Sequence, residues 1–181
     1  MSTIKIKIEN TTIESANIKE LNSNVKEYGI LVSKHVHLGN NVTLSKGVTI
    51  GVGCKIADGV VINKNASVAD ECIIGENSII GEGVIIETGV VVGKNVIIED
   101  DLIVGEEAVI DDSVLLKDTF YKKTIKSNIT YCGNGKASIG CQLFKIDFWI
   151  KNYQKVADKF DYTQQEIEEC LIHMKHIKNN I

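Results

Sequence analysis

Residues 74–98 read IGENSIIGEGVIIETGVVVGKNVII, and the spacing of aliphatic residues in this stretch continues through the whole middle of the chain. An aliphatic residue returns at every sixth position, at Val32, Leu38, Leu44, Ile50, Ile56, Ile62, Val68, Ile74, Ile80, Ile86, Val92, Ile98, Val104, Ile110 and Leu116. Self-similarity at a fixed period is the signature of a repeat architecture. We therefore take the period of six as the feature that decides the fold.

A second, smaller set of residues lies two positions before each aliphatic position, at Ile30, Val36, Val42, Val48, Cys54, Val60, Ala66, Cys72, Ser78, Val84, Val90, Val96, Leu102, Ala108 and Val114. Residues i and i−2 of a strand share a face, so each hexapeptide is predicted to be a short strand with one large and one small inward side chain. Gly or Asn often follows three residues after the large position, as at Asn41 and Gly47. Both tolerate positive φ, so the chain can turn a corner every six residues.

Segments such as Ile50-Gly-Val-Gly-Cys and Ile80-Gly-Glu-Gly-Val resemble the left-handed parallel β-helix of the hexapeptide-repeat superfamily. The resemblance implies a prism of about five coils, stacked about 4.8 Å apart, over residues 30–118. It also implies a homotrimer. Most members transfer acyl groups from a thioester to a hydroxyl or amine, and one branch comprises gamma-class carbonic anhydrases that depend on a metal.

The residue between the two inward positions is expected to point outward, and from Ile73 to Leu115 it is always aliphatic. Residues 18 apart should stack on one face, so all three faces become apolar from the third coil onward. A soluble monomer would not expose such surfaces. Two covers are expected: neighbouring subunits about a threefold axis, and the C-terminal segment folding back.

We divide the chain into an N-terminal strand or cap (residues 1–29), the β-helix (30–118) and a C-terminal segment (119–181). Ile4, Ile6 and Ile8 alternate as an edge strand would. The C-terminal segment holds nine of the ten aromatic residues, which suit it to cover a surface. Its Asn-Gly pair predicts a β-hairpin over residues 127–141. Two helices should follow, the first with an aromatic side formed by Phe148, Trp149, Tyr153, Val156 and Phe160. The second should begin at a capping box of Thr163 and Glu166 and present Ile167, Leu171, Met174 and Ile177 as its apolar stripe.

Composition narrows the classes of partner. The 181 residues carry a formal net charge of −4 without a basic cluster, so nucleic acid is not an expected partner. No apolar run approaches the length of a membrane helix, and we expect no signal peptide. Five cysteines without a secretory signal favour a reducing cytoplasm over a disulfide framework.

His35 and His37 are the histidines of the repeat and the candidate catalytic residues. The resemblance implies a His that acts as general base at an intersubunit groove, and imidazole suits that task near neutral pH. However, the loop that carries this His in many family members is missing. Residues 38–172 contain no His, so a three-histidine metal site would need His173 or His176 from the tail. No metal is predicted.

Acetyl-CoA is the expected acyl donor, and it needs cations for its phosphates. The late coils carry seven acids between Glu99 and Asp112, which disfavours phosphate there. Lys122, Lys123, Lys126 and Lys136 follow, and Lys136 adjoins the Gly133-Asn-Gly135 turn, whose peptide amides could help bind an anion. The alternative is a solvated basic loop. Similarly, the acids could bind a divalent cation or merely solvate an edge.

The cysteines are interpreted as packing residues. Cys54 and Cys72 lie 18 apart at the small inward position, so they should stack as buried free thiols. Cys132 and Cys141 flank the expected hairpin and could cross-link or share a metal, although their spacing matches no zinc motif.

The sequence thus favours a trimeric acyltransferase acting on a small acceptor such as a sugar, with His37 or His35 as base and corner amides polarising the thioester. A non-catalytic trimeric scaffold is the alternative, and a carbonic-anhydrase-like metalloenzyme is the third possibility. The function rests on family analogy.

Overall fold

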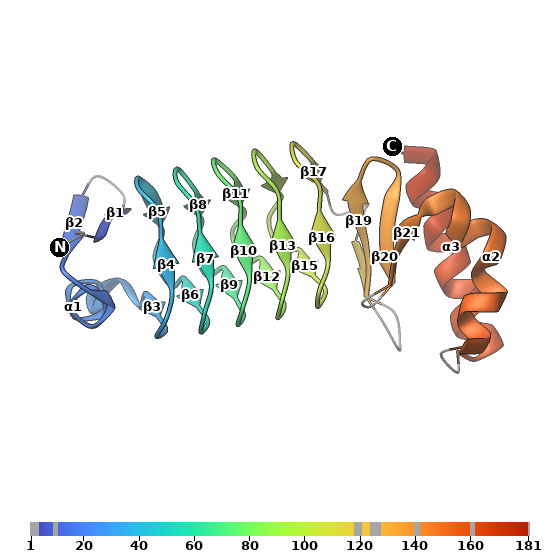
Figure 1. Ribbon diagram of the computed structural model, residues 1–181, viewed down its shortest axis with the longest axis horizontal. Coiled ribbons are helices and arrows are strands. Elements are labelled where there is room, and N and C mark those ends of the chain that lie inside the picture. Colours follow the sequence, from blue (N-terminus) through green and yellow to red (C-terminus); the bar gives the residue numbers. More distant parts are fainter. Residues whose placement is uncertain are drawn as a thin grey trace.

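The computed structural model describes residues 4–8, 11–117, 121–123, 128–139, 142–159 and 162–180. Its centre is a parallel β-helix of about five coils, with a small N-terminal cap at one end and a sheet with two helices at the other (Figure 1). Fifteen short strands form the coils: β3 Leu31–Val32, β4 His37–Leu38, β5 Val42–Leu44, β6 Thr49–Ile50, β7 Lys55–Ile56, β8 Val61–Ile62, β9 Ser67–Val68, β10 Ile73–Ile74, β11 Ile79–Ile80, β12 Ile85–Ile86, β13 Val91–Val92, β14 Ile97–Ile98, β15 Ile103–Val104, β16 Val109–Ile110 and β17 Leu115–Leu116.

The strands stack into three parallel sheets, one for each side of the prism. Their orders are β3-β6-β9-β12-β15, β4-β7-β10-β13-β16 and β5-β8-β11-β14-β17. Two N-terminal strands, β1 Ile4–Ile8 and β2 Thr11–Ser15, extend the last of these sheets. Each residue pairs with the residue 18 positions later, as Ile73 does with Val91. The predicted repeat and the stacking of one coil on the next are therefore confirmed.

Every corner of the prism contains one residue with positive φ. From His35 to Ser113 these residues recur at every sixth position, with φ between 55° and 78°. Gly and Asn occupy most of them, as predicted, but Glu71 and Glu107 also adopt this conformation, at φ 58° and 55°. A side chain with a Cβ is unfavourable there, by about 1 kcal/mol or more.

Replacing Glu71 with Gly should stabilise the protein by about 0.5–1 kcal/mol, because Gly removes this conformational cost at an exposed corner. Chemical denaturation measures the change. Glu82 provides the matched control, since it is an exposed corner residue whose φ is not positive. Glu82→Gly should lower the stability instead, and an equal effect of both substitutions would contradict the explanation.

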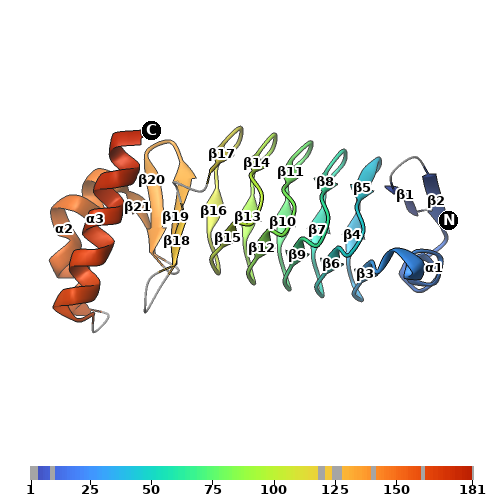
Figure 2. The same cartoon turned by 180° about the vertical axis from the view of Figure 1, so that it is seen from behind.

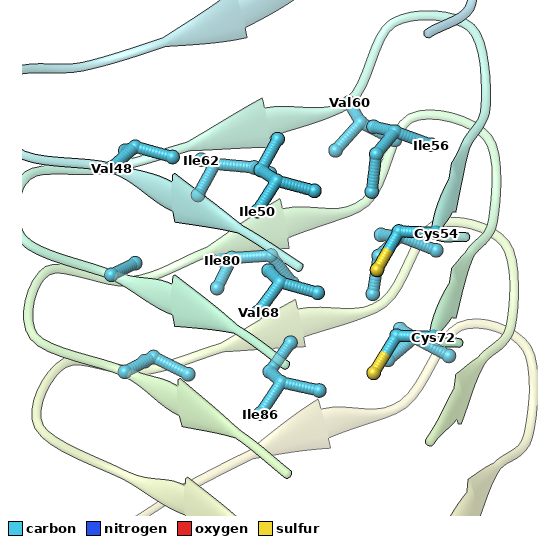
Figure 3. Packing of buried hydrophobic residues seen from close by; sticks show 14 of the residues in the cluster. Val48, Ile50, Cys54, Ile56, Val60, Ile62, Val68, Cys72, Ile80 and Ile86 are labelled. Atoms are coloured by element: carbon cyan, nitrogen blue, oxygen red, sulfur yellow. The ribbon is translucent and has the colours of Figure 1, made fainter. Parts of the chain in front are cut away.

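The inward side chains form one continuous apolar core along the prism (Figure 3). Cys54 and Cys72 stack within it as buried free thiols, as predicted. Their Sγ atoms lie 2.9 and 3.1 Å from the carbonyl oxygens of Ala69 and Glu87, and the Ser78 hydroxyl donates to the Gly93 carbonyl at 2.9 Å. Small polar groups at the inward position thus satisfy corner carbonyls that the strands leave unpaired.

Aspartates hold successive coils together at several corners. The carboxylate of Asp100 accepts the peptide N–H of Glu82 at 2.7 Å, and Asp112 accepts that of Lys94 in the same way. The glycine before each donor permits this approach, because a Cβ on Gly81 would lie 2.6 Å from the Glu99 carbonyl carbon. Asp100 and Asp112, two of the seven late acids, therefore join one coil to the next.

The N-terminal segment closes the first coil. It consists of β1 Ile4–Ile8, β2 Thr11–Ser15, α1 Ile18–Asn24 and the short helix η1 Lys26–Tyr28. Strand β1 was expected at an edge, and this expectation is wrong. It lies between β5, with which it is parallel, and the antiparallel β2, because Ile6 and Ile8 extend the core of the prism beyond the first coil.

The C-terminal segment forms a four-stranded antiparallel sheet and two helices. The strands are β18 Tyr121–Lys123, β19 Asn128–Gly133, β20 Lys136–Ile139 and β21 Gln142–Lys145, and the helices are α2 Ile146–Lys159 and α3 Gln164–Asn180. The predicted hairpin is present as β19 and β20, with Asn134 and Gly135 at its turn. The predicted capping box is also present, since the Thr163 N–H donates to the Glu166 carboxylate at 2.7 Å.

The prediction of an aromatic side on the first helix is right only in part. Trp149 is buried and donates to the Ala137 carbonyl at 2.8 Å, whereas Phe148 is 40% exposed. Phe160 and the side chain of Val156 lie outside the described residues. On α3 the buried stripe is Ile167, Cys170, Met174 and Ile177, so Cys170 takes the place expected for Leu171.

The described strands and helices of the C-terminal segment do not cover the outward aliphatic side chains. It stacks on the end of the prism, beyond β16 and β17, and leaves the three faces open (Figure 2). Its contact with the last coil includes the Asp111 N–H, which donates to the Cys132 carbonyl at 2.8 Å. Six of the outward aliphatic residues are exposed, namely Ile73, Ile79, Ile85, Ile97, Val109 and Leu115. The expectation that the C-terminal segment folds back over these aliphatic side chains is therefore wrong for the described residues.

Candidate functional site

A groove of about 550 Å³ runs along one side of the prism, over the first strands of the β4 sheet and the corner that follows them. Ile73 gives it an exposed apolar side chain, whereas the side chains of Ile56 and Ile74, which also line it, are buried in the core. Its polar lining consists of His37, Lys55, Asp58, Glu76 and Lys94. Its volume lies in the range of small-molecule sites. The charged lining residues together with the exposed side chain of Ile73 suit a small polar ligand.

His37 stands at the N-terminal end of this groove. Its peptide N–H donates to the Cys54 carbonyl at 2.8 Å, which fixes the backbone of β4, and its side chain points outward and is exposed. Among the described residues none hydrogen-bonds with the imidazole. Nothing in this part of the chain therefore orients the ring or blocks either nitrogen from a ligand.

The charged groups of the groove differ in what they bind. Lys55 lies directly beside His37 in the β4–β7 register and makes no ion pair with a described residue. Lys94 is paired with Glu76 at 3.1 Å. Hydrogen bonds from the peptide N–H and side chain of Asn40 hold the pKa of Asp58 below its usual value, so this carboxylate stays ionised. Lys55 is thus the groove cation that remains available to an anion.

His35 does not line the groove. It occupies the positive-φ corner position that precedes β4, with φ 60°, and its side chain is exposed. Of the two candidate histidines, the structure brings only His37 together with other groove residues.

The turn predicted to bind CoA is engaged in packing. Lys136 pairs with Asp111 at 3.2 Å, and the Asn134 side chain donates to the same carboxylate at 2.8 Å. Gly133 is buried against Val114, and the Gly135 N–H lies 3.4 Å from the Tyr131 hydroxyl. These contacts attach the hairpin to the last coil.

The remaining basic residues of that prediction are only partly described. Lys122 and Lys123 belong to β18, but their side chains lie outside the described residues, as does Lys126 altogether. The hairpin and His37 occupy opposite ends of the prism (Figure 1). Four strand spacings separate β4 from β16, or roughly 19 Å. One protomer therefore does not bring the predicted base and the predicted CoA turn together.

A family model described as the GMPPB C-terminal domain matches residues 22–130, which are more than half of the chain and include the whole prism. The chain belongs to the GMPPB C-terminal domain family. No curated protein matches it. Solved structures similar to this chain include the acetyltransferase domain of PglB from Neisseria gonorrhoeae in complex with acetyl coenzyme A. The two sequences are 24% identical, the match covers 48% of this chain and 50% of the Neisseria chain, and the TM-score is 0.39.

Also similar is a hexapeptide-repeat acetyltransferase from Vibrio cholerae, complexed with acetyl coenzyme A. The two sequences are 19% identical, the match covers 69% of this chain and 77% of the Vibrio chain, and the TM-score is 0.43. The chain thus spans about half the length of the Neisseria structure. At these identities the likeness concerns the fold alone. The predicted relation to hexapeptide-repeat proteins is confirmed by the prism itself.

In this member of the GMPPB C-terminal domain family, Cys132 and Cys170 are buried packing residues. Burial raises the pKa of Cys132 and of Cys170 to about 11, which disfavours the reactive thiolate. Cys132 is a free thiol, and Cys141 lies outside the described residues. In the described part of the chain, no three His, Cys, Asp or Glu side chains are grouped as a metal site would require. None of the helices described has both the length and the apolar character of a membrane span.

Sequence reasoning missed Lys55, Asp58 and Lys94. The signal was present, since Lys55 lies 18 residues after His37 and therefore beside it on the same face. Asp58, Glu76 and Lys94 continue the same spacing along the adjoining corner. The stacking rule that predicted the apolar faces would have assembled this charged set as well.

Proposed function

We propose that the chain transfers an acyl group, in the simplest case acetyl, from acyl-CoA to a hydroxyl or amine of a small acceptor such as a sugar, with His37 as the general base. The observation that carries the proposal is the groove, which combines an accessible imidazole, an available ammonium group and the exposed apolar side chain of Ile73. A neutral imidazole can take a proton from the acceptor near neutral pH.

The reaction needs few groups. His37 removes the proton as the acceptor oxygen or nitrogen attacks the thioester carbonyl. The carbon–sulfur bond then breaks, and the CoA sulfur leaves with the proton returned by the imidazole. Donors that face the developing oxyanion would accelerate this step. The peptide N–H of Glu76 is a candidate, because it lines the groove corner and has no acceptor among the described residues.

The proposal includes a homotrimer. The outward aliphatic side chains of the late coils form an apolar surface that the chain's own C-terminal segment leaves open, and Ile85 is 44% exposed. Association about a threefold axis would bury these side chains. A neighbouring subunit could also provide the CoA contacts and the orienting group that His37 lacks within its own chain. The free thiols agree with a reducing cytoplasm as the site of the reaction.

A trimeric scaffold without catalysis is the second candidate. Two observations favour it: the repeat runs without an inserted loop from β3 to β17, and the matching family model describes a C-terminal domain, a part of a larger protein. A scaffold would use the same apolar faces but would leave the groove empty. Binding of the acyl donor therefore separates the two candidates.

Acetyl-CoA should stabilise the protein against thermal unfolding. At a hundred times its dissociation constant it adds about 2.7 kcal/mol, which moves the midpoint by several degrees in a chain of this size. Lys55→Gln should reduce the shift, because Lys55 is the available groove cation. Lys151→Gln, on the exposed side of α2, is the matched control and should keep it. No shift with the unmodified protein would support the scaffold.

A further inference from the structure

The three sheets of the prism end differently at their N-terminal edges. On the sheet that contains β5, strand β1 adds a parallel partner. On the sheet that begins with β3, the side chain of Asn22 takes the place of a partner strand. Among the strands that the structure describes, β4 ends the third sheet and has β7 as its single partner. This open edge belongs to the strand that carries His37.

Asn22 shows which chemical group such an edge accepts. Its amide nitrogen donates to the Val32 carbonyl at 2.6 Å, and its Oδ1 accepts the Val32 N–H at 2.9 Å. One carboxamide therefore satisfies both peptide groups of Val32, as a neighbouring strand would. The carboxamide thus makes the two hydrogen bonds that a further strand would otherwise make.

Leu38 is the equivalent of Val32 on the third sheet. His37 and Gly39 donate to the carbonyls of Cys54 and Ile56 at 2.8 and 2.7 Å, toward the next coil. Strand alternation then directs the N–H and C=O of Leu38 the opposite way, to the open edge. Among the described residues none pairs with either group.

The open edge lies beside the groove, since both neighbours of Leu38, His37 and Gly39, line the groove, although Leu38 itself does not. We infer that the edge of β4 binds a carboxamide of the acceptor, as Asn22 occupies the edge of β3, so that the acceptor is a small molecule with an N-acyl group, such as an N-acylated amino sugar. The inference rests on the proposed function. An acceptor anchored at Leu38 presents its hydroxyls to the imidazole of the preceding residue.

N-acetylglucosamine and glucose form a suitable probe pair, because both carry sugar hydroxyls and only the first carries the amide. In deuterated, ¹⁵N-labelled protein, N-acetylglucosamine should shift the Leu38 amide resonance saturably. The Val32 amide, already paired with Asn22, should not respond. Glucose should bind about tenfold more weakly, and KM in the acyl-transfer assay should differ between the sugars by a similar factor.

The inference is overturned if both sugars shift Leu38 equally, if Val32 responds as strongly as Leu38, or if Leu38 does not respond to N-acetylglucosamine. Turnover of N-acetylglucosamine without a response at Leu38 would remove this inference and leave acyl transfer standing. A selective response at Leu38 without turnover of either sugar would retain the amide site and remove the proposed function.

Discussion

Replacing His37 with glutamine is expected to lower kcat/KM for acyl transfer by about 10²–10⁴-fold, the usual contribution of a positioned general base. The fold should be unaffected, because the imidazole is exposed and hydrogen-bonds no described residue. Free CoA should be quantified by chromatography, so that the measurement does not depend on a thiol reagent in a protein with five cysteines. Acetyl-CoA binding should persist in the variant, which separates loss of the base from loss of the donor.

Two further histidines make the test specific. His176→Gln changes an exposed residue of α3 far from the groove and should retain full activity. His35→Gln should also retain activity, because His35 lies at a corner and does not line the groove. If instead His35→Gln abolished turnover and His37→Gln did not, the base would be the other histidine and the groove would not be the active site.

Gly81→Ala is expected to destabilise the protein by about 3 kcal/mol, at the upper end of the usual cost of overpacking. A Cβ at this position would lie 2.6 Å from the Glu99 carbonyl carbon and 2.7 Å from the Asp100 nitrogen. Both are backbone atoms of the next coil, so no side-chain rotation relieves the contact. For a chain of this size the thermal midpoint should fall by about 10 °C.

Gly53→Ala separates steric contact from backbone conformation. Gly53 has φ 74°, but the nearest atom to its Cβ position is Glu71 Cγ at 3.7 Å. Alanine should therefore cost only the positive φ, about 1 kcal/mol. Equal losses for the two variants, measured by chemical denaturation, would mean that the coils do not approach as closely as the structure shows.

The prism could be predicted from the sequence because each of its determinants is local and repeats. A large residue such as Ile80, a small one such as Ser78 and a corner residue such as Asn77 occupy fixed places in every hexapeptide. The position of each residue, inward or at a corner, does not depend on distant parts of the chain. The hairpin was predictable for the same reason, since Asn134 and Gly135 define its turn.

The ends of the prism could not be predicted in this way. Whether β1 lies at an edge depends on β2 and β5, which are distant in sequence from one another, and nothing within Ile4–Ile8 encodes that pairing. The placement of the C-terminal segment is likewise tertiary. The aromatic residues of this segment indicate correctly that Trp149 is buried. They do not indicate which surface of the prism the segment contacts.

The candidate site was predicted only as far as His37. Lys136 was chosen from its neighbours in sequence, whereas its actual partner is Asp111, 25 residues earlier. Lys55 was not predicted because it lies beside His37 only after one full coil of the prism, 18 residues later in the sequence. In a β-helix the neighbours that matter chemically are 18 residues apart, and local motifs do not show them.

The two end caps also limit growth of the molecule. A stack of parallel strands offers unpaired peptide groups at both ends, and uncapped stacks of this kind can add further chains end to end into fibrils. Here β1 and Asn22 occupy two of the three N-terminal edges, and β19 receives the Asp111 N–H at the other end. Among the described strands, two N-terminal edges stay unpaired. One is that of the two-residue β4, which is too short to template a filament, and the other is that of β2, which runs antiparallel to the strands of the prism.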